Sequence, residues 1–153
     1  MWTFPLRTQN WQGKDSQAYK TLRHFTITPR LQRLFMSPRT VEHMTWHQSH
    51  DAVDGVMMHP SNGEVWKHFN SMHPHFSAES RNVRLELCTN GFNLFGSFAT
   101  PYPCWPVILT VYNLLLGMCM RPEFMFLSTV IPSPSSPGRN IDVCLRPLID
   151  ELT

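Results

Sequence analysis

Residues 81–96 of this 153-residue chain read R-N-V-R-L-E-L-C-T-N-G-F-N-L-F-G, and the fold expected for the chain follows from them. Apolar and charged side chains alternate in its first half, from Val83 to Leu87. A period of two is typical of a β-strand with one face on a core and the other face in water. The stretch therefore predicts a half-buried strand.

Thr89-Asn90-Gly91 is predicted to end this strand in a turn. Asn and Gly both tolerate the positive φ that many turns require. Asn90 is therefore expected at the carboxyl end of a strand, where its side chain leaves the sheet and can meet a substrate.

Two more strands and a closing helix are predicted downstream. Residues 105–112 and 124–131 are rich in strand formers, and residues 141–152 have a helical apolar period with Asn140 as a candidate cap. Pro147 should kink or restart this helix. The order strand, strand, strand, helix predicts a mixed α/β fold with a three-stranded antiparallel meander plus a helix, preceded by short helices.

A membrane helix is the alternative for residues 105–120, which carry no charged side chain. The run is shorter than the ~20 residues that a spanning helix needs. Pro106 and Asn113 interrupt it, and its first half consists of strand formers. A buried strand is favoured, and no membrane partner is expected.

Short helices are predicted in the region that precedes the half-buried strand of residues 81–96. Thr28-Pro29 and Ser37-Pro38 are typical helix starts, and Ser61 with Glu64 has capping-box spacing. Pro74 should end the helix that follows, so that residues 70–80 form a loop.

The positive charge of the chain is concentrated in its first third. Residues 1–50 hold seven Lys or Arg against two acids, whereas residues 51–153 hold six against nine. Basic residues that cluster in one region can contact the phosphates of DNA, although a solvated helix face has the same appearance. The candidate DNA-binding residues are Lys20, Arg23, Arg30, Arg33 and Arg39.

Neither the cysteines nor the histidines indicate a metal site. Cys88, Cys104, Cys119 and Cys144 are far apart and form no C-x-x-C pair, so buried free thiols are expected. His43 and His47 have the spacing of a metal-binding pair on a helix, but the glutamate of an H-E-x-x-H site is missing. Surface or packing histidines are the favoured interpretation.

Ordered motifs from about Leu22 to Leu152 resemble the plant CACTA-type (En/Spm) transposases. The motifs are R-N-V-R-L-x-L-x-x-N-G-F-N-x-F-G, L-Q-R-L-F-M-S, M-T-W-H, D-G-V, H-P-x-x-G-E-x-W-K-x-F, W-P-V-I-L, Y-N-L, M-C-M, S-P-G and I-D-V-x-L-x-P-L-I-x-E-L. Residues 1–20 match nothing in that family. The resemblance implies a ribonuclease-H-like domain that cuts and joins DNA with Mg²⁺ or Mn²⁺ ions held by carboxylates.

The resemblance also implies that the chemistry fails in this chain. The family has an aspartate in the first-carboxylate position, where this sequence has Asn90. A neutral amide cannot bridge two cations with negative charge. The remaining acids near the motifs are expected to lie on solvated faces; they are Glu86, Asp142, Asp150 and Glu151.

The sequence is therefore interpreted as a truncated and degenerate CACTA transposase without catalytic activity or cofactor. Residues 1–20 form an unmatched loose segment, 21–80 a helical N-terminal region, and 81–153 the first part of the ribonuclease-H-like domain. The alternatives are a module that binds DNA or full-length transposase and, less favoured, an active strand transferase. Family resemblance implies a nuclear location, and no small-molecule substrate is expected.

Overall fold

The computed structural model describes residues 2–6, 20–50, 53, 55–93, 103–132, 137–138 and 141–153. The chain divides into two compact units, which we describe separately. Unit 1 comprises residues 1–29, 87–108 and 127–153, and unit 2 comprises residues 30–86 and 109–126.

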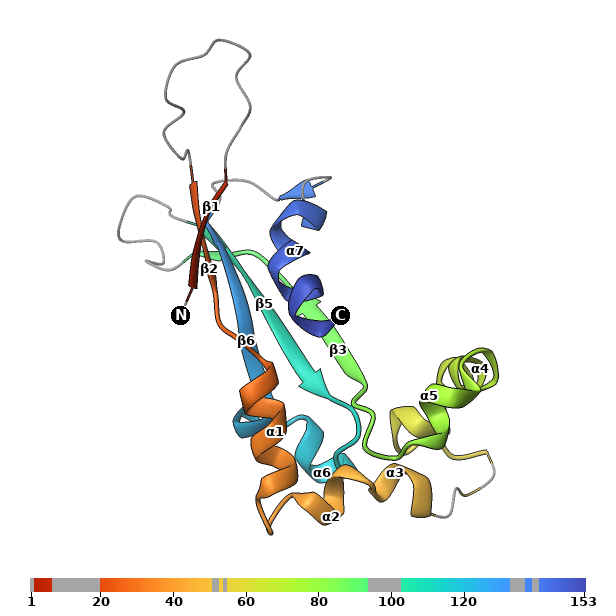
Figure 1. Cartoon of the computed structure of the whole chain (residues 1–153). Coiled ribbons are helices and arrows are strands. Elements are labelled where there is room, and N and C mark those ends of the chain that lie inside the picture. Colours follow the sequence, from red (N-terminus) through yellow and green to blue (C-terminus); the bar gives the residue numbers. More distant parts are fainter. Residues whose placement is uncertain are drawn as a thin grey trace. The chain divides into compact units, whose positions relative to one another are not determined.

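All six strands of the described residues belong to one antiparallel sheet (Figure 1). Its order is β1-β2-β6-β5-β3, and β4 also pairs with β5. The strands are β1 Trp2–Leu6, β2 Lys20–His24, β3 Leu85–Thr89, β4 Phe92–Asn93, β5 Pro103–Val111 and β6 Met125–Pro132. The mixed α/β class and the meander of β3, β5 and β6 are confirmed.

The helices lie mainly before β3 and after β6 in the chain. They are α1 Thr28–Met36, α2 Val41–Met44, α3 Trp46–Ser49, α4 Glu64–Met72, α5 Pro74–Ala78, α6 Leu116–Cys119 and α7 Ile141–Leu152, with short 3-10 helices at Pro60–Asn62 (η1) and Pro122–Phe124 (η2). The predicted helices near Thr28, after Ser37 and at the end of the chain are confirmed. The helix α7 does not restart at Pro147, and Asn140 lies outside the described residues.

The predicted turn at Asn90 and Gly91 is wrong. Neither residue has a positive φ, and the chain continues beyond them into β4, which pairs with β5. Thr89 ends β3 and Phe92 begins β4, and both strands pair with β5. Asn90 and Gly91 therefore link two stretches of one sheet instead of forming a turn with positive φ.

Residues 2–6 also differ from the loose segment expected at the N-terminus. They form β1, which pairs antiparallel with β2 from Trp2 opposite His24 to Leu6 opposite Lys20. Their partner strand continues the sheet through β6. Alternation in five residues is too short a signal to identify a strand without its partner.

Unit 1 is held by a carboxylate from the end of the chain. Glu151 in α7 accepts hydrogen bonds from the backbone N–H groups of Ile27 and Thr28, both at 2.8 Å, where α1 begins. Its second oxygen lies 3.1 Å from Nε2 of buried His24, whose Nδ1 lies 3.2 Å from Thr129 Oγ1. The Glu151 side chain is only 14% exposed, so the predicted solvated face is wrong for this residue.

In unit 2, the buried amide of Asn113 likewise binds backbone groups that are distant in the sequence. Asn113 is fully buried after β5; its Oδ1 accepts the Arg84 backbone N–H at 2.7 Å, and its Nδ2 donates to the Asn82 carbonyl at 2.9 Å. The Tyr112 N–H also donates to the Arg84 carbonyl at 2.9 Å. These bonds fix the start of β3 against the end of β5, because each would cost free energy if left unpaired in the interior.

Two local predictions before β3 need correction. Ser61 does not cap α4; it lies in η1, where the His59 side chain accepts the Ser61 N–H. Pro74 ends α4 as predicted, but it also begins α5, so residues 70–80 are not a plain loop. Proline suits the first helical position because its missing N–H would have no helical partner there.

The structure bears on two further expectations, a buried strand instead of a membrane helix and buried cysteine thiols. Among the described residues, no helix is long and apolar enough to cross a membrane. All four cysteines are free, as expected, but only three are buried, because Cys88 on the edge strand β3 is exposed. The apolar face of β3 is also only partly covered, with Leu87 42% exposed.

Replacing Glu151 by alanine should destabilise the fold by about 1–2 kcal/mol, because helix N–H groups and His24 lose their acceptor. Burial opposes the charged form of Glu151, but hydrogen bonds from Thr28, Ile27 and His24 outweigh it and lower its pKa. The stabilisation by the Glu151 carboxylate should therefore be complete above the ordinary carboxyl pKa. It should disappear as the pH falls through the lowered pKa of Glu151 in the folded protein. Urea unfolding at several pH values measures both effects.

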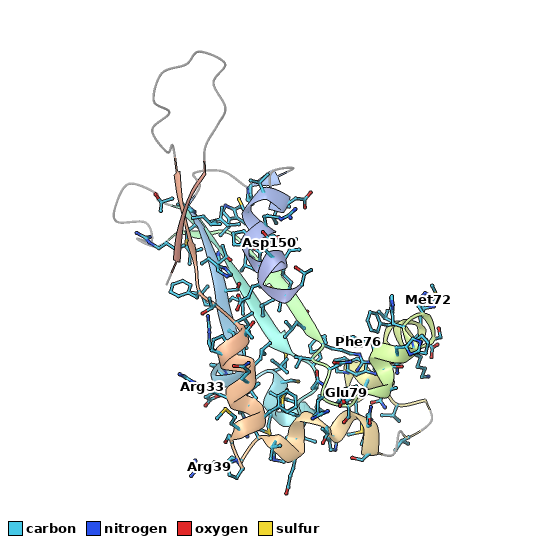
Figure 2. The ribbon with its side chains drawn as sticks, in the orientation of Figure 1. Arg33, Arg39, Met72, Phe76, Glu79 and Asp150 are labelled. Carbon is cyan, nitrogen blue, oxygen red and sulfur yellow. The ribbon has the colours of Figure 1, made fainter. Side chains whose placement is uncertain are left out.

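The matched control is Asp150→Ala, because Asp150, labelled in Figure 2, is an exposed residue of α7 whose side chain forms an ion pair with Arg146 at 2.7 Å. Its effect should stay within about 0.5 kcal/mol, as for exposed ion pairs. Equal losses for the two variants would contradict the capping role of Glu151.

Candidate functional site

Asn90, the residue in the expected first-carboxylate position, has an exposed side chain between β3 and β4. The backbone around it is fixed by a close approach at the next residue. A Cβ built on Gly91 would lie 2.7 Å from Cζ2 of Trp105 and 2.8 Å from Cε2. Glycine is therefore required here by the indole ring across the strands, and not by a turn.

The side chains that the structure describes do not fit a two-metal site of the kind that the resemblance implies. Among the described residues, no group of three His, Cys, Asp or Glu side chains is placed to hold an ion. Asp142 and Asp150 are exposed on α7, and Glu151 is engaged with α1 and His24. Magnesium requires several oxygen ligands with near-octahedral geometry, and these side chains do not supply such a set.

The five basic candidates are divided between the units. Lys20 and Arg23 are in unit 1. The Lys20 backbone pairs with Leu6 in the sheet, and the Lys20 side chain lies outside the described part of the chain. The Arg23 side chain is exposed. Arg30, Arg33 and Arg39 are in unit 2.

Arg33 on α1 and Arg39 after it are both exposed and project away from the ribbon (Figure 2). Arg30 is half-buried, with its guanidinium carbon 5.7 Å from the centre of the Phe126 ring. Arg33 and Arg39 thus have the exposure that a phosphate contact needs.

The histidine pair His43 and His47 is separated by a break between two short helices. His43 is in α2 and His47 is in α3, with Thr45 between the two helices. The i, i+4 geometry of one continuous helix is therefore absent. His47 is instead a buried packing residue whose ring lies edge-on to Trp66 at 5.5 Å.

The strongest chemical constellation in unit 2 surrounds Arg84, which the alternation had placed on a solvent face. Its guanidinium carbon is 4.1 Å from the centre of the Trp66 ring, 5.6 Å from that of Phe69 and 5.4 Å from that of Phe76. Its Nη2 donates to Asn70 Oδ1. Stacking of a cation on aromatic faces stabilises it where water is partly excluded. Burial lowers the Arg84 pKa, as expected for a desolvated cation.

A cleft of about 830 Å³ opens beside this cation. Aromatic and aliphatic side chains form most of its wall, and Arg84 and Glu64 are its charged members. Glu64 is exposed and pairs with Lys67 at 2.8 Å. The lining residues are Met57, Pro60, Gly63, Glu64, Val65, Trp66, Phe69, Phe76, Val83, Arg84, Leu85 and Tyr112.

The pKa of His47 is lowered by its surroundings near this cleft. Burial first, and then the positive charge of Arg84, lower its pKa from 6.5 to about 4, whereas backbone groups of Asn113 and Met44 act in the opposite direction. Neither ring nitrogen has a hydrogen-bond partner of good geometry among the described residues. His47 is therefore neutral at physiological pH.

His59 completes the polar support of the same unit. Its Nε2 donates to the Leu114 carbonyl at 3.0 Å, and its Nδ1 accepts the Ser61 N–H at 3.1 Å. Burial lowers its pKa, although the bond to Leu114 opposes this. Because both ring nitrogens are occupied, His59 is a structural residue and not a candidate base or metal ligand.

A family model described as transposase family tnp2 matches residues 54–153, about two-thirds of the chain. The chain belongs to transposase family tnp2. A search of curated proteins and a search of solved structures gave no significant match.

The tnp2 match contains every residue that lines the cleft and also contains Asn90. The five basic candidates all precede its first residue. The cleft therefore lies in the part of the chain that defines its tnp2 membership, and the basic residues lie outside that part.

Sequence reasoning missed the cleft because its rings come from separate segments. Trp66 and Phe69 are on α4, Phe76 is on α5 and Tyr112 follows β5. The only available signal was a charged residue among apolar ones at the start of β3, and that pattern equally describes an arginine in water.

Replacing Arg84 by glutamine should raise the pKa of His47 from about 4 towards 6.5 without reaching it, because burial, the larger cause, remains. The low pKa also predicts that stability falls as the pH drops from about 6.5 to about 4, because protonation then favours the unfolded chain. A proton NMR titration of the histidine rings measures the pKa. Arg81→Gln removes an exposed arginine paired with Glu79 and should leave it unchanged.

Proposed function

We propose that this tnp2-family chain is a CACTA-type transposase copy of plant origin that contacts DNA without cutting it. The long motif series from Leu22 to Leu152 supports the CACTA type and the plant origin. A ribonuclease-H-like topology is supported by the neighbour order of β6, β5 and β3 and by α7 following β6. The resemblance to this family supports a nuclear location.

The observation that carries the proposal is the amide at Asn90, which has no negative charge with which to hold a divalent ion. Two-metal cleavage needs ions about 4 Å apart to activate the attacking oxygen and to stabilise the leaving oxygen. Such a pair of cations requires several carboxylates.

The DNA contact is assigned to the exposed arginines of unit 2. Arg33 and Arg39 are exposed around α1, and the first fifty residues have a large excess of positive charge. Cations that replace condensed counterions on DNA give sequence-independent affinity that falls with salt. Arg30 is a weaker candidate, because its guanidinium stacks on Phe126.

Replacing both Arg33 and Arg39 by glutamine should weaken duplex DNA binding and reduce the slope of log affinity against log salt by about 2. Fluorescence anisotropy with a labelled duplex over a salt series measures both quantities. Arg146→Gln, which removes a cation paired with Asp150, should have little effect. No detectable duplex binding at low salt would contradict the DNA contact.

The protein should not nick supercoiled plasmid DNA in the presence of Mg²⁺ or Mn²⁺, because a neutral amide at Asn90 supplies no ligand charge. Agarose gels separate the supercoiled, nicked and linear forms. Asn90→Ala serves as the matched variant. Metal-dependent nicking by the natural protein that Asn90→Ala abolishes would overturn the proposal of inactivity.

A further inference from the structure

We propose that the cleft beside Arg84 binds an unpaired nucleotide of single-stranded DNA, with its base against the aromatic wall and its phosphate on the guanidinium. This inference deepens the proposed DNA contact and partly rests on it, since DNA is taken as the partner. It concerns a different surface from Arg33 and Arg39, because neither of these residues lines the cleft.

The wall of the cleft has the chemistry of a base-stacking site. Trp66, Phe69, Phe76 and Tyr112 contribute aromatic rings, and Phe69 is 38% exposed. Every base has a flat apolar face, so stacking on such rings contributes about 1–3 kcal/mol per base without regard to sequence. The volume of about 830 Å³ is in the range of small-molecule sites and is sufficient for a nucleotide.

Arg84 supplies the complementary charge. Among the described residues no carboxylate pairs with it, and of its three guanidinium nitrogens only Nη2 makes a hydrogen bond, to Asn70. The Nε atom is buried without an acceptor. A desolvated cation with unused donors favours an anion with several oxygens, and a guanidinium matches phosphate geometry well.

An apolar peptide is a poorer fit to these observations. Such a peptide would cover the aliphatic and aromatic wall, but it would leave the Arg84 charge uncompensated and further desolvated, which costs free energy. A nucleotide satisfies the rings and the cation together. The duplex itself does not suit the cleft, because its bases are stacked on one another and their faces are not accessible.

The test measures binding of a labelled short oligothymidylate by fluorescence anisotropy, next to a duplex and an abasic oligonucleotide of equal length. The thymidylate should bind more tightly than the abasic strand, because only the former has bases to stack. Arg84→Gln and Phe69→Ala should each weaken thymidylate binding by about tenfold or more. Arg84→Lys should bind thymidylate little better than Arg84→Gln does, since lysine lacks the planar fork of donors that a guanidinium has.

Two controls separate this site from the other surfaces. Arg81→Gln removes an arginine that does not line the cleft and that pairs with Glu79, so it should leave thymidylate affinity unchanged. The double variant Arg33→Gln, Arg39→Gln should weaken duplex binding. It should have little effect on the preference for thymidylate over the abasic strand. Circular dichroism and urea unfolding verify that each variant is folded, and Phe69→Ala removes the more exposed ring to limit structural damage.

The outcomes distinguish the two proposals. If the natural protein binds no duplex at low salt but keeps an Arg84-dependent preference for thymidylate, the cleft site stands and the duplex contact of Arg33 and Arg39 is overturned. Equal affinity for thymidylate and abasic strands, or no effect of Arg84→Gln and Phe69→Ala, would overturn the cleft site. An apolar fluorescent dye that binds in a Phe69-dependent manner and is not displaced by thymidylate would show that the cleft takes an apolar partner instead.

Discussion

A half-buried positive charge without an acidic partner among the described residues dominates unit 2. Arg84 begins the pairing of β3 with β5 through its backbone, and its side chain gathers Trp66, Phe69 and Phe76 around one cation. The same charge helps to hold a neighbouring histidine neutral. Three aromatic rings and the Asn70 amide in this unit thus stabilise one guanidinium that is partly withdrawn from water.

Each unit relies on a polar side chain that reaches backbone groups distant in the sequence. In unit 2, the fully buried Asn113 uses both ends of its amide on the segment before β3. In unit 1, Glu151 uses its two oxygens on the start of α1 and on His24. Hydrogen bonds of this kind specify a position more strictly than apolar packing does, because their loss leaves buried groups unpaired.

Local periodicity was sufficient to predict the strands β3, β5 and β6 and the helix α7, because each has a pattern of its own and a clear length. It failed where a partner decides the outcome. Asn90-Gly91 has the composition of a turn, yet neither residue has a positive φ, and the Trp105 ring lies against Gly91. Glu151 similarly has the neighbours of a surface residue, and only the folded chain brings it to α1.

The bond between Glu151 and the Ile27 N–H spans 124 residues of sequence. Contacts of such separation require a large loop to close before they contribute, and this slows folding. During synthesis on the ribosome, the first turn of α1 must therefore wait for its acceptor until residue 151 has been translated.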